Sequence, residues 1–223
     1  MSTLNTAYDT PAARGTATDH DARALLGRVM GYVAVTAGFT ALGAYLGRDL
    51  SGGVGLLLFL PGIAAIVGLN LAAAKGREQL ATGLLFALGL LLGLSVAPVI
   101  ADYAGADPSA LWQAAGATAA FVAALGAYGY ATSRDLSAWA RPLFWALLGL
   151  IVFGLVAIFV AIPAGNVIYA VAGLVIFGGF TIIDFNRLRR STPDAAVPIA
   201  AGIFLDVFNV FLLGLDLFGG RRD

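Results

Sequence analysis

The chain has no cysteine, and its single histidine, His20, lies in the polar N-terminal stretch. Without cysteine it forms no disulfide and offers no thiolate nucleophile or thiolate metal ligand. One histidine outside the apolar stretches excludes a histidine-based catalytic dyad within them and any polyhistidine metal site. Charge is also scarce, at 12% of residues against about 25% in soluble domains. The charges balance to zero net charge, so no nucleic-acid partner is indicated.

Hydrophobic residues, in contrast, make up 60% of the 223 residues. They fall into seven runs of about the 20 residues that a helix needs to cross a bilayer. The runs predict an all-α polytopic membrane protein with spans at 25–46, 53–74, 81–100, 110–131, 142–162, 168–188 and 197–218. Residues 1–24 are polar and lack periodicity, which predicts a disordered tail before a single transmembrane domain, 25–223.

Most lysines and arginines of the short connections fall on the side of the membrane that carries the N-terminus, which predicts a cytoplasmic N-terminus. Few lysines beside many arginines and alanines suggest a GC-rich bacterium, and hence a bacterial plasma membrane. Arg221 and Arg222 are the exception to the charge rule. Either the seventh run spans fully and leaves them outside, or it forms a re-entrant hairpin that returns the C-terminus inside.

Two aspartates lie within the last two apolar runs. Asp184 is near the end of the sixth run, and Asp206 is about nine residues, or roughly 14 Å, into the seventh. A carboxylate at such depth costs about 2.5–3.5 kcal/mol on insertion scales, so both are expected to face a protein interior or a water-filled path. Antiparallel helices joined by a short loop can bring them to a similar depth. Two adjacent carboxylates cannot both ionise easily and tend to share a proton, which predicts a pair that titrates as a unit and offers oxygen ligands suited to calcium.

Three further residues are candidates for the same path. Asn209 lies one turn after Asp206, and Asp216 lies near the far end of the same run, so both could line a pore. Arg187 could act as a charge latch for the pair. A second interpretation stays open, in which Asp184 reaches the membrane surface and is neutralised by Arg187, while Asp206 only forms a hydrogen bond between helices.

Three sequence blocks carry a likeness to a known family. The blocks are YGYATSRDLSAWARPLFWALLGLIVFGLVAIF, FGGFTIIDFNRLRR and LDVFNVFLLGLDLFGGRRD, with FALGLLLGLSVAPVI as a weaker fourth. They resemble, in order, the junction of the fourth and fifth spans, the sixth-span aspartate before a basic stretch, and the C-terminal helix of the Bax inhibitor family. This family comprises the transmembrane Bax-inhibitor-motif proteins and their bacterial YccA-like relatives. The likeness runs from near Arg28 to the C-terminus.

The resemblance implies a seven-helix bundle whose last helix is surrounded by the other six. It also implies that Asp184 and Asp206 form a pH-sensing pair that controls a calcium leak. The expected function is therefore a pH-sensitive calcium (cation) leak channel, with calcium as the permeant ion and no cofactor. The alternative is a non-conducting regulator that binds another membrane protein, such as an AAA quality-control protease, through its polar N-terminal tail.

This chain departs from the family's pattern in two places. Some bacterial members close the pair with an arginine in the second span, but residues 53–74 carry no charge. The latch would then be Lys75, Arg77 or Arg187, or would be absent. In addition, Phe185 and Asn186 follow the sixth-span aspartate, where many members have Thr-Gln.

A further interpretation of the pair is an enzyme. Intramembrane aspartyl proteases also place aspartates on their sixth and seventh spans. Their second aspartate lies in a Gly-x-Gly-Asp motif, and a Pro-Ala-Leu motif follows later in their sequences. Here Asp206 follows Ile203, Phe204 and Leu205, and nothing like the second motif is present. We therefore expect no enzymatic activity.

Overall fold

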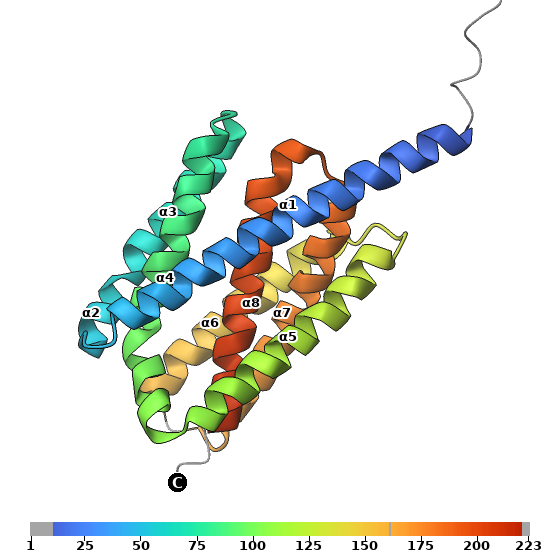
Figure 1. The fold of residues 1–223 in the computed structure, drawn as a ribbon. Helices are drawn as coiled ribbons and strands as arrows, with labels where there is room; N and C mark the ends of the chain where they lie inside the picture. The colour runs from blue at the N-terminus through green and yellow to red at the C-terminus, as the bar shows by residue number, and fades with distance from the viewer. Residues whose placement is uncertain (1–10, 161, 220–223) are drawn as a thin grey trace, which may run out of the picture.

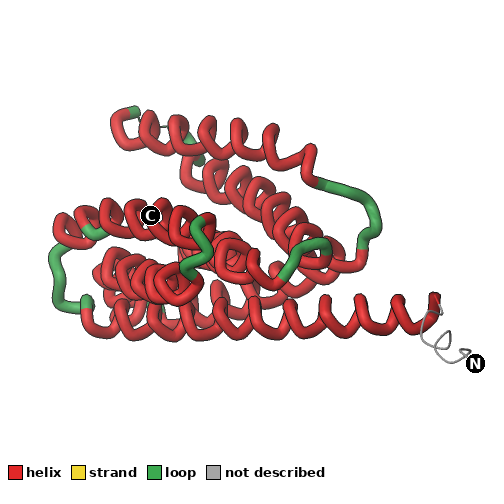
Figure 2. Tube along the Cα trace, turned by 90° about the horizontal axis from the view of Figure 1, so that it is seen from above, coloured by secondary structure: helices red, strands yellow, loops and turns green. Residues whose placement is uncertain are grey.

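The computed structural model describes residues 11–160 and 162–219, and these form helices and short connections without a strand (Figures 1 and 2). In chain order the elements are α1 (Pro11–Leu46), α2 (Gly52–Leu57), α3 (Phe59–Ala74), α4 (Glu78–Ala106), α5 (Pro108–Ala131), η1 (Ser137–Trp139), α6 (Ala140–Phe159), α7 (Gly165–Arg189), η2 (Pro193–Ala195) and α8 (Ala196–Gly219). Seven segments of the described chain are long and apolar enough to cross a membrane. The predicted all-α, seven-span architecture is confirmed.

Several helix boundaries differ from the prediction, and α4 ends at Ala106, six residues beyond the predicted end of its span. α1 begins at Pro11, so residues 11–24, predicted to be disordered, are helical, while residues 1–10 lie outside the described part of the chain. A helix that is already nucleated in a bundle adds further residues at little cost, so a polar segment can continue it. α6 ends at Phe159, three residues before the predicted end. Pro163 lies just beyond, and a proline disfavours helical backbone in the residue before it.

The second span is divided into two helices at Leu58, between α2 and α3. Pro61 lies three residues later and explains the interruption. A proline has no N–H to donate, and its ring clashes with the carbonyl four residues earlier, here that of Leu57, the last residue of α2. α4 also contains a proline, Pro98, but continues through it to Ala106.

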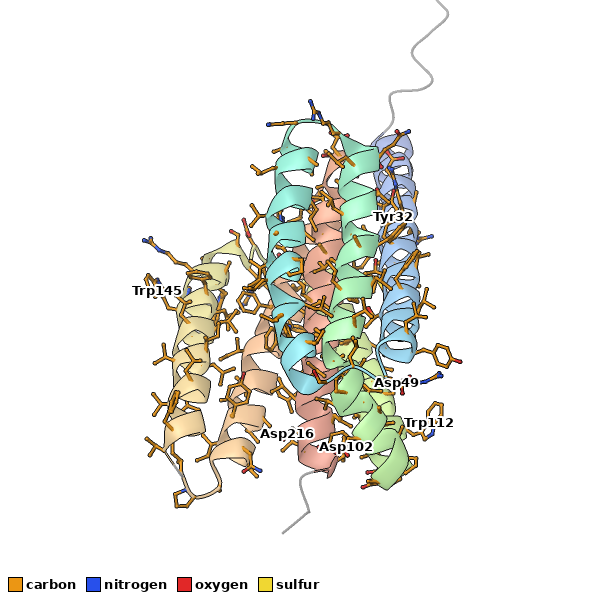
Figure 3. All side chains as sticks on the ribbon, turned by 90° about the vertical axis from the view of Figure 1, so that its left-hand side faces the viewer. Tyr32, Asp49, Asp102, Trp112, Trp145 and Asp216 are labelled. Carbon is orange, nitrogen blue, oxygen red and sulfur yellow. The ribbon has the colours of Figure 1, made fainter. Side chains whose placement is uncertain are left out.

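α8 is the most buried of the seven spans and lies at the centre of the bundle (Figure 1). It packs against α1, α3, α4, α5 and α7. α6 instead packs on α7 and η1 and forms the outer edge of the molecule, as Figure 3 shows. The expected central position of the C-terminal helix is confirmed, but its neighbours are mainly five of the other spans, with α6 set apart.

α8 is a continuous helix from Ala196 to Gly219. It therefore spans fully and contains no re-entrant hairpin, which decides between the two arrangements that the sequence left open. Its C-terminal end lies at the opposite end of the bundle from the α7–α8 connection and from the start of α1 (Figure 1). Arg221 and Arg222 themselves lie outside the described residues.

Small residues bring α1 and α4 into close contact. A Cβ on Gly89 would lie 2.7 Å from Cγ2 of Thr36, and a Cβ on Gly93 would collide with the backbone of Thr40. The hydroxyls of Thr36 and Thr40 donate to carbonyls of their own helix, at 2.7 and 3.0 Å, so they add no unpaired group to this interface. Close backbone approach at small residues is the usual way in which helices pack in membranes, where no hydrophobic force drives association.

Gly93→Ala is expected to destabilise the fold by about 1–3 kcal/mol, the usual cost of overpacking. The added methyl group meets the backbone of Thr40, which cannot move aside as a flexible side chain can. The measurement is thermal unfolding in detergent. Gly83→Ala, on the same helix but with open space around the added group, is the matched control, and equal melting temperatures for the two variants would contradict this account.

Candidate functional site

Asp184 and Asp206 lie on the antiparallel helices α7 and α8, which are joined through η2. Asp206 is buried, with 5% of its surface exposed, and Asp184 is partly buried. The two carboxyls are close enough for Asp184 to act electrostatically on Asp206. The structure therefore brings the two aspartates together inside the bundle, and their role as a gate stays a prediction.

Gly202 determines how closely Asp184 approaches α8. It lies four residues before Asp206, which is about one helical turn, so both are on the same side of α8. A Cβ at Gly202 would collide with Oδ2 of Asp184 and would lie 3.2 Å from its Cγ. The carboxyl of Asp184 thus lies against the backbone of α8. Only glycine at position 202 leaves space for it, because any side chain there would overlap with the carboxyl.

The carboxyl of Asp206 is incompletely hydrogen-bonded. Its Oδ2 is buried and has no hydrogen-bond partner among the described residues. The hydroxyl of Thr181, one turn before Asp184, lies beside the carboxyl and also donates to the carbonyl of Phe177 at 2.8 Å. A buried acceptor without a partner costs about 1–3 kcal/mol, and more when it is charged. Such a group is a candidate for binding a proton or a cation.

Arg187 is the cation that acts on Asp184. It lies one turn later on α7 and is exposed, and the two form no ion pair within 4 Å among the described residues. Lys75 and Arg77 are exposed at the α3–α4 connection and form no ion pair with either aspartate in the described part of the chain. Of the three residues that the sequence offered as a latch, Arg187 is the one that the structure places near the pair.

A cavity of about 1060 Å³ lies between α3, α6, α7 and α8. It is lined by the last part of α6, the first part of α7 and the last part of α8, which places it at the end of the bundle away from the α7–α8 connection. Asn209 and Asp216 both line it, together with Asn166 and Tyr169. Figure 3 shows Asp216 between the lower parts of α7 and α8.

Asp206, Asn209 and Asp216 share one face of α8. At about 100° per residue, positions three and ten residues apart differ by less than a quarter turn around the helix axis. Asn209 donates from Nδ2 to the carbonyl of Leu205 at 2.7 Å. A row of polar side chains therefore leads from the cavity to the buried aspartate, in an otherwise apolar helix.

Asn186 organises the connection between α5 and α6. It is 2% exposed, and its Nδ2 donates to the carbonyls of Gly129, Thr132 and Arg134 at 3.1–3.3 Å. Its Oδ1 accepts from the backbone N–H of Leu136 at 3.3 Å. This side chain thus ties α7 to the end of α5, two residues after Asp184.

Asn186→Ala is expected to lower the free energy of unfolding by about 2–3 kcal/mol, because it leaves buried carbonyls and an N–H unpaired. Thermal unfolding in detergent measures this change. The matched control is Asn70→Ala, since Asn70 is exposed and donates only to Ile66 of its own helix. A loss no greater than that of the control would show that Asn186 does not organise the connection.

Arg189 and Arg190 bind the same connection. Arg189 donates from Nη1 to the carbonyls of Tyr130, Ala131 and Thr132, at the C-terminal end of α5, where a cation is favourable. Arg190 donates to the carbonyl of Ser133 at 2.6 Å and pairs with Asp135 at 3.8 Å. The backbone N–H of Ser137 donates to Asp135 and, with Arg190, lowers the pKa of that exposed carboxyl. The basic cluster therefore has a structural role beyond setting the topology.

Sequence reasoning missed three residues around the pair: Thr181, Gly202 and Asn186. Helical spacing would have placed Thr181 and Gly202 on the same faces as Asp184 and Asp206. It would not have shown that these faces meet. Asn186 was noted only as a departure from the family's pattern, although a buried amide so close to the aspartate is itself a signal.

The described residues contain no group of three or more histidine, cysteine, aspartate or glutamate side chains that could hold a metal ion. The two aspartates supply at most four oxygens, whereas calcium takes about six to eight. A calcium ion at the pair would therefore keep part of its hydration water. Such incomplete coordination by the protein suits an ion that passes through better than an ion that stays bound.

Together, the fold and the site define an integral membrane protein of seven spans, whose central last helix carries a buried aspartate near an aspartate of the preceding helix. Residues 22–223 match the family model described as inhibitor of apoptosis-promoting Bax1, and the chain belongs to this Bax inhibitor family.

Three relatives illustrate the breadth of this family. An uncharacterized protein of Helicobacter pylori (strain ATCC 700392 / 26695) is 29% identical over 164 residues, which is 73% of this chain and 70% of that protein. The inner membrane protein YbhL of Escherichia coli K12 is 28% identical over 176 residues, 74% of each chain. A Golgi anti-apoptotic protein of vaccinia virus (strain Lister) is 31% identical over 164 residues, 72% of this chain and 68% of that protein.

Proposed function

We propose that the protein is a pH-sensitive leak channel for cations, with calcium as the permeant ion and Asp184 and Asp206 as the gating pair. The observation that carries the proposal is the buried Oδ2 of Asp206, which has no hydrogen-bond partner in the described part of the chain and lies near a second carboxyl and one turn from a residue of the cavity. An isolated carboxylate at this depth is costly unless it is protonated or meets a cation. Protons and cations therefore compete for the same oxygens.

The pair would gate by changing its charge. Two carboxyls in contact tend to share one proton and titrate together, so the gain or loss of that proton changes the repulsion between α7 and α8. Because the carboxyl of Asp184 lies against Gly202, a stronger repulsion between the two carboxyls would push on the backbone of α8 at this position. A small shift of α8 there would connect the pair to the cavity, where Asn209 and Asp216 would receive the cation.

In this proposal the protein is not an enzyme and needs no cofactor. It interacts with the lipid bilayer, with protons and with calcium, the permeant ion. It lies in a bacterial plasma membrane, with its N-terminus in the cytoplasm. The basic connections α3–α4, α5–α6 and α7–α8 support this orientation, because they share the end of the bundle where α1 starts. The Escherichia coli relative YbhL is named as an inner membrane protein, which supports this location.

The test is calcium influx into liposomes that contain the purified protein and a trapped calcium dye, recorded across about pH 5 to 8, the range in which a shared-proton pair can titrate. The proposal expects a flux above that of protein-free liposomes that changes with pH. Folded, correctly inserted protein without flux at any pH in this range would contradict it.

A second function has one observation in its favour. The N-terminal part of α1 projects past the neighbouring helices in Figures 1 and 2, where another membrane protein, such as a quality-control protease, could bind it. The protein would then be a non-conducting regulator. Deletion of residues 1–21 tests this alternative. Loss of the cellular phenotype with unchanged calcium flux would favour the regulator, and an unchanged phenotype would exclude this segment as the binding site.

A further inference from the structure

An apolar groove runs along α5, on the side of the bundle that faces α1. It consists of two cavities, of about 500 and 410 Å³, which share Ala115 and Phe211 in their walls. One end lies at Pro108 and Trp112, at the start of α5, and the other reaches Leu26 of α1. The groove therefore extends from one membrane surface into the bundle.

The groove exists because α5 carries small side chains on this face. Ala115, Ala119 and Ala123, spaced four residues apart, all line the inner cavity and are all exposed. α1 packs on α4 and α8, while α5 packs on α7 and α8, so the space between α1 and α5 is left to these alanines. Thr118 also lines the groove, but its hydroxyl oxygen is buried, so the accessible wall is apolar.

We propose that a phospholipid acyl chain occupies this groove, with its headgroup at the Trp112 end. A groove that opens sideways from a membrane-spanning bundle faces hydrocarbon, so its natural occupant is an acyl chain rather than water. Trp112 is 79% exposed at the end of its span, where tryptophan marks the level of the headgroups. The lining residues run from Trp112 at the start of α5 to Leu26 of α1, so an acyl chain anchored at Trp112 would extend into the bundle.

The occupied groove would touch the helices that hold the aspartate pair. Phe185 and Val207 line its inner part, and they directly follow Asp184 and Asp206 in the chain. An acyl chain here would support the packing of α7 and α8 next to the pair. This effect on gating rests on the proposed leak, whereas the lipid site itself does not.

Photolabelling tests the site. The protein is reconstituted in phosphatidylethanolamine–phosphatidylglycerol liposomes that contain a phosphatidylglycerol with a diazirine in its acyl chain, and labelled residues are found by mass spectrometry. Val207 and Phe211 of α8 are partly buried and line the groove, so an acyl chain seated in it would contact them. The proposal expects labelling of Val207 or Phe211 on α8, besides the exposed face of α5.

Ala119→Phe fills the groove, and labelling of α8 should fall by roughly fivefold or more. Ala120→Phe, on the adjacent residue that does not line the groove, is the matched control and should leave it unchanged. Ala115→Leu replaces Ala119→Phe if that variant does not fold. Unlabelled α8 in the wild type, or equal labelling in the groove variant and the control, would overturn the site. Labelled α8 in a protein without calcium flux would keep the lipid site and contradict the leak instead.

Discussion

Asp206→Asn is expected to abolish the pH dependence of calcium flux, so that rates at about pH 5 and pH 8 agree within roughly twofold. Asparagine keeps the size of the side chain but has no group that ionises in this pH range and carries no charge. The remaining carboxyl, Asp184, then has no partner with which to share a proton. Flux is measured in the liposome assay, with each rate normalised to the amount of inserted protein.

The variant should fold, because it replaces a buried carboxyl, one oxygen of which has no hydrogen-bond partner among the described residues, with a neutral group of the same shape. Asp184→Asn is expected to have the same effect, since the pair titrates as a unit. Asp49→Asn is the matched control, since Asp49 is exposed at the α1–α2 connection and pairs there with Arg48. If Asp206→Asn keeps the wild-type pH profile, the pair is not the pH sensor.

Gly202→Ala should change gating without removing any titratable group. The added methyl group would collide with the carboxyl of Asp184 and push it away from α8 and from Asp206. Separation weakens the repulsion that makes the pair hold its proton, so the midpoint of the pH profile should move to lower pH. A shift of about one pH unit corresponds to about 1.4 kcal/mol of lost interaction between the carboxyls.

Gly214→Ala is the matched control for this prediction, because it lies on the same helix and its added group would meet only ordinary contacts, the nearest at 3.6 Å. Both variants are compared with the wild type in flux and in thermal unfolding. A shifted profile in Gly202→Ala at an unchanged melting temperature would separate an effect on the pair from general damage. An unchanged profile in a variant that folds would show that the contact at Gly202 does not matter for gating.

The sequence could predict the spans and the approximate depth of the pair because both follow from long apolar runs and short loops. Two helices that run antiparallel from a short connection must bring nearby positions to a similar depth, whatever their side chains are. The structure has Asp184 near Asp206, as this geometry requires, and Asn209 and Asp216 lie along the same helix. No detail of packing is needed for this prediction.

The contacts around the pair could not be predicted, because they depend on the angle at which helices cross. Gly202 is one of 29 glycines, and its spacing does not show that it faces Asp184. The four hydrogen bonds of Asn186 depend on the path of the α5–α6 connection, which lacks regular periodicity. The helical start of α1 was missed for another reason, because polar residues without periodicity can still extend a helix that begins in the membrane.

An infrared titration of the pair, recorded beside the flux assay, tests directly whether the two aspartates gate the leak. The carbonyl stretch of protonated carboxyls is recorded across about pH 5 to 8, the range in which a shared-proton pair can titrate. The spectrum of the Asp206→Asn variant is subtracted from that of the wild type at each pH. The account predicts a difference band whose titration midpoint coincides with the midpoint of calcium flux. A pH-dependent flux without any change of this band over the same range would contradict it.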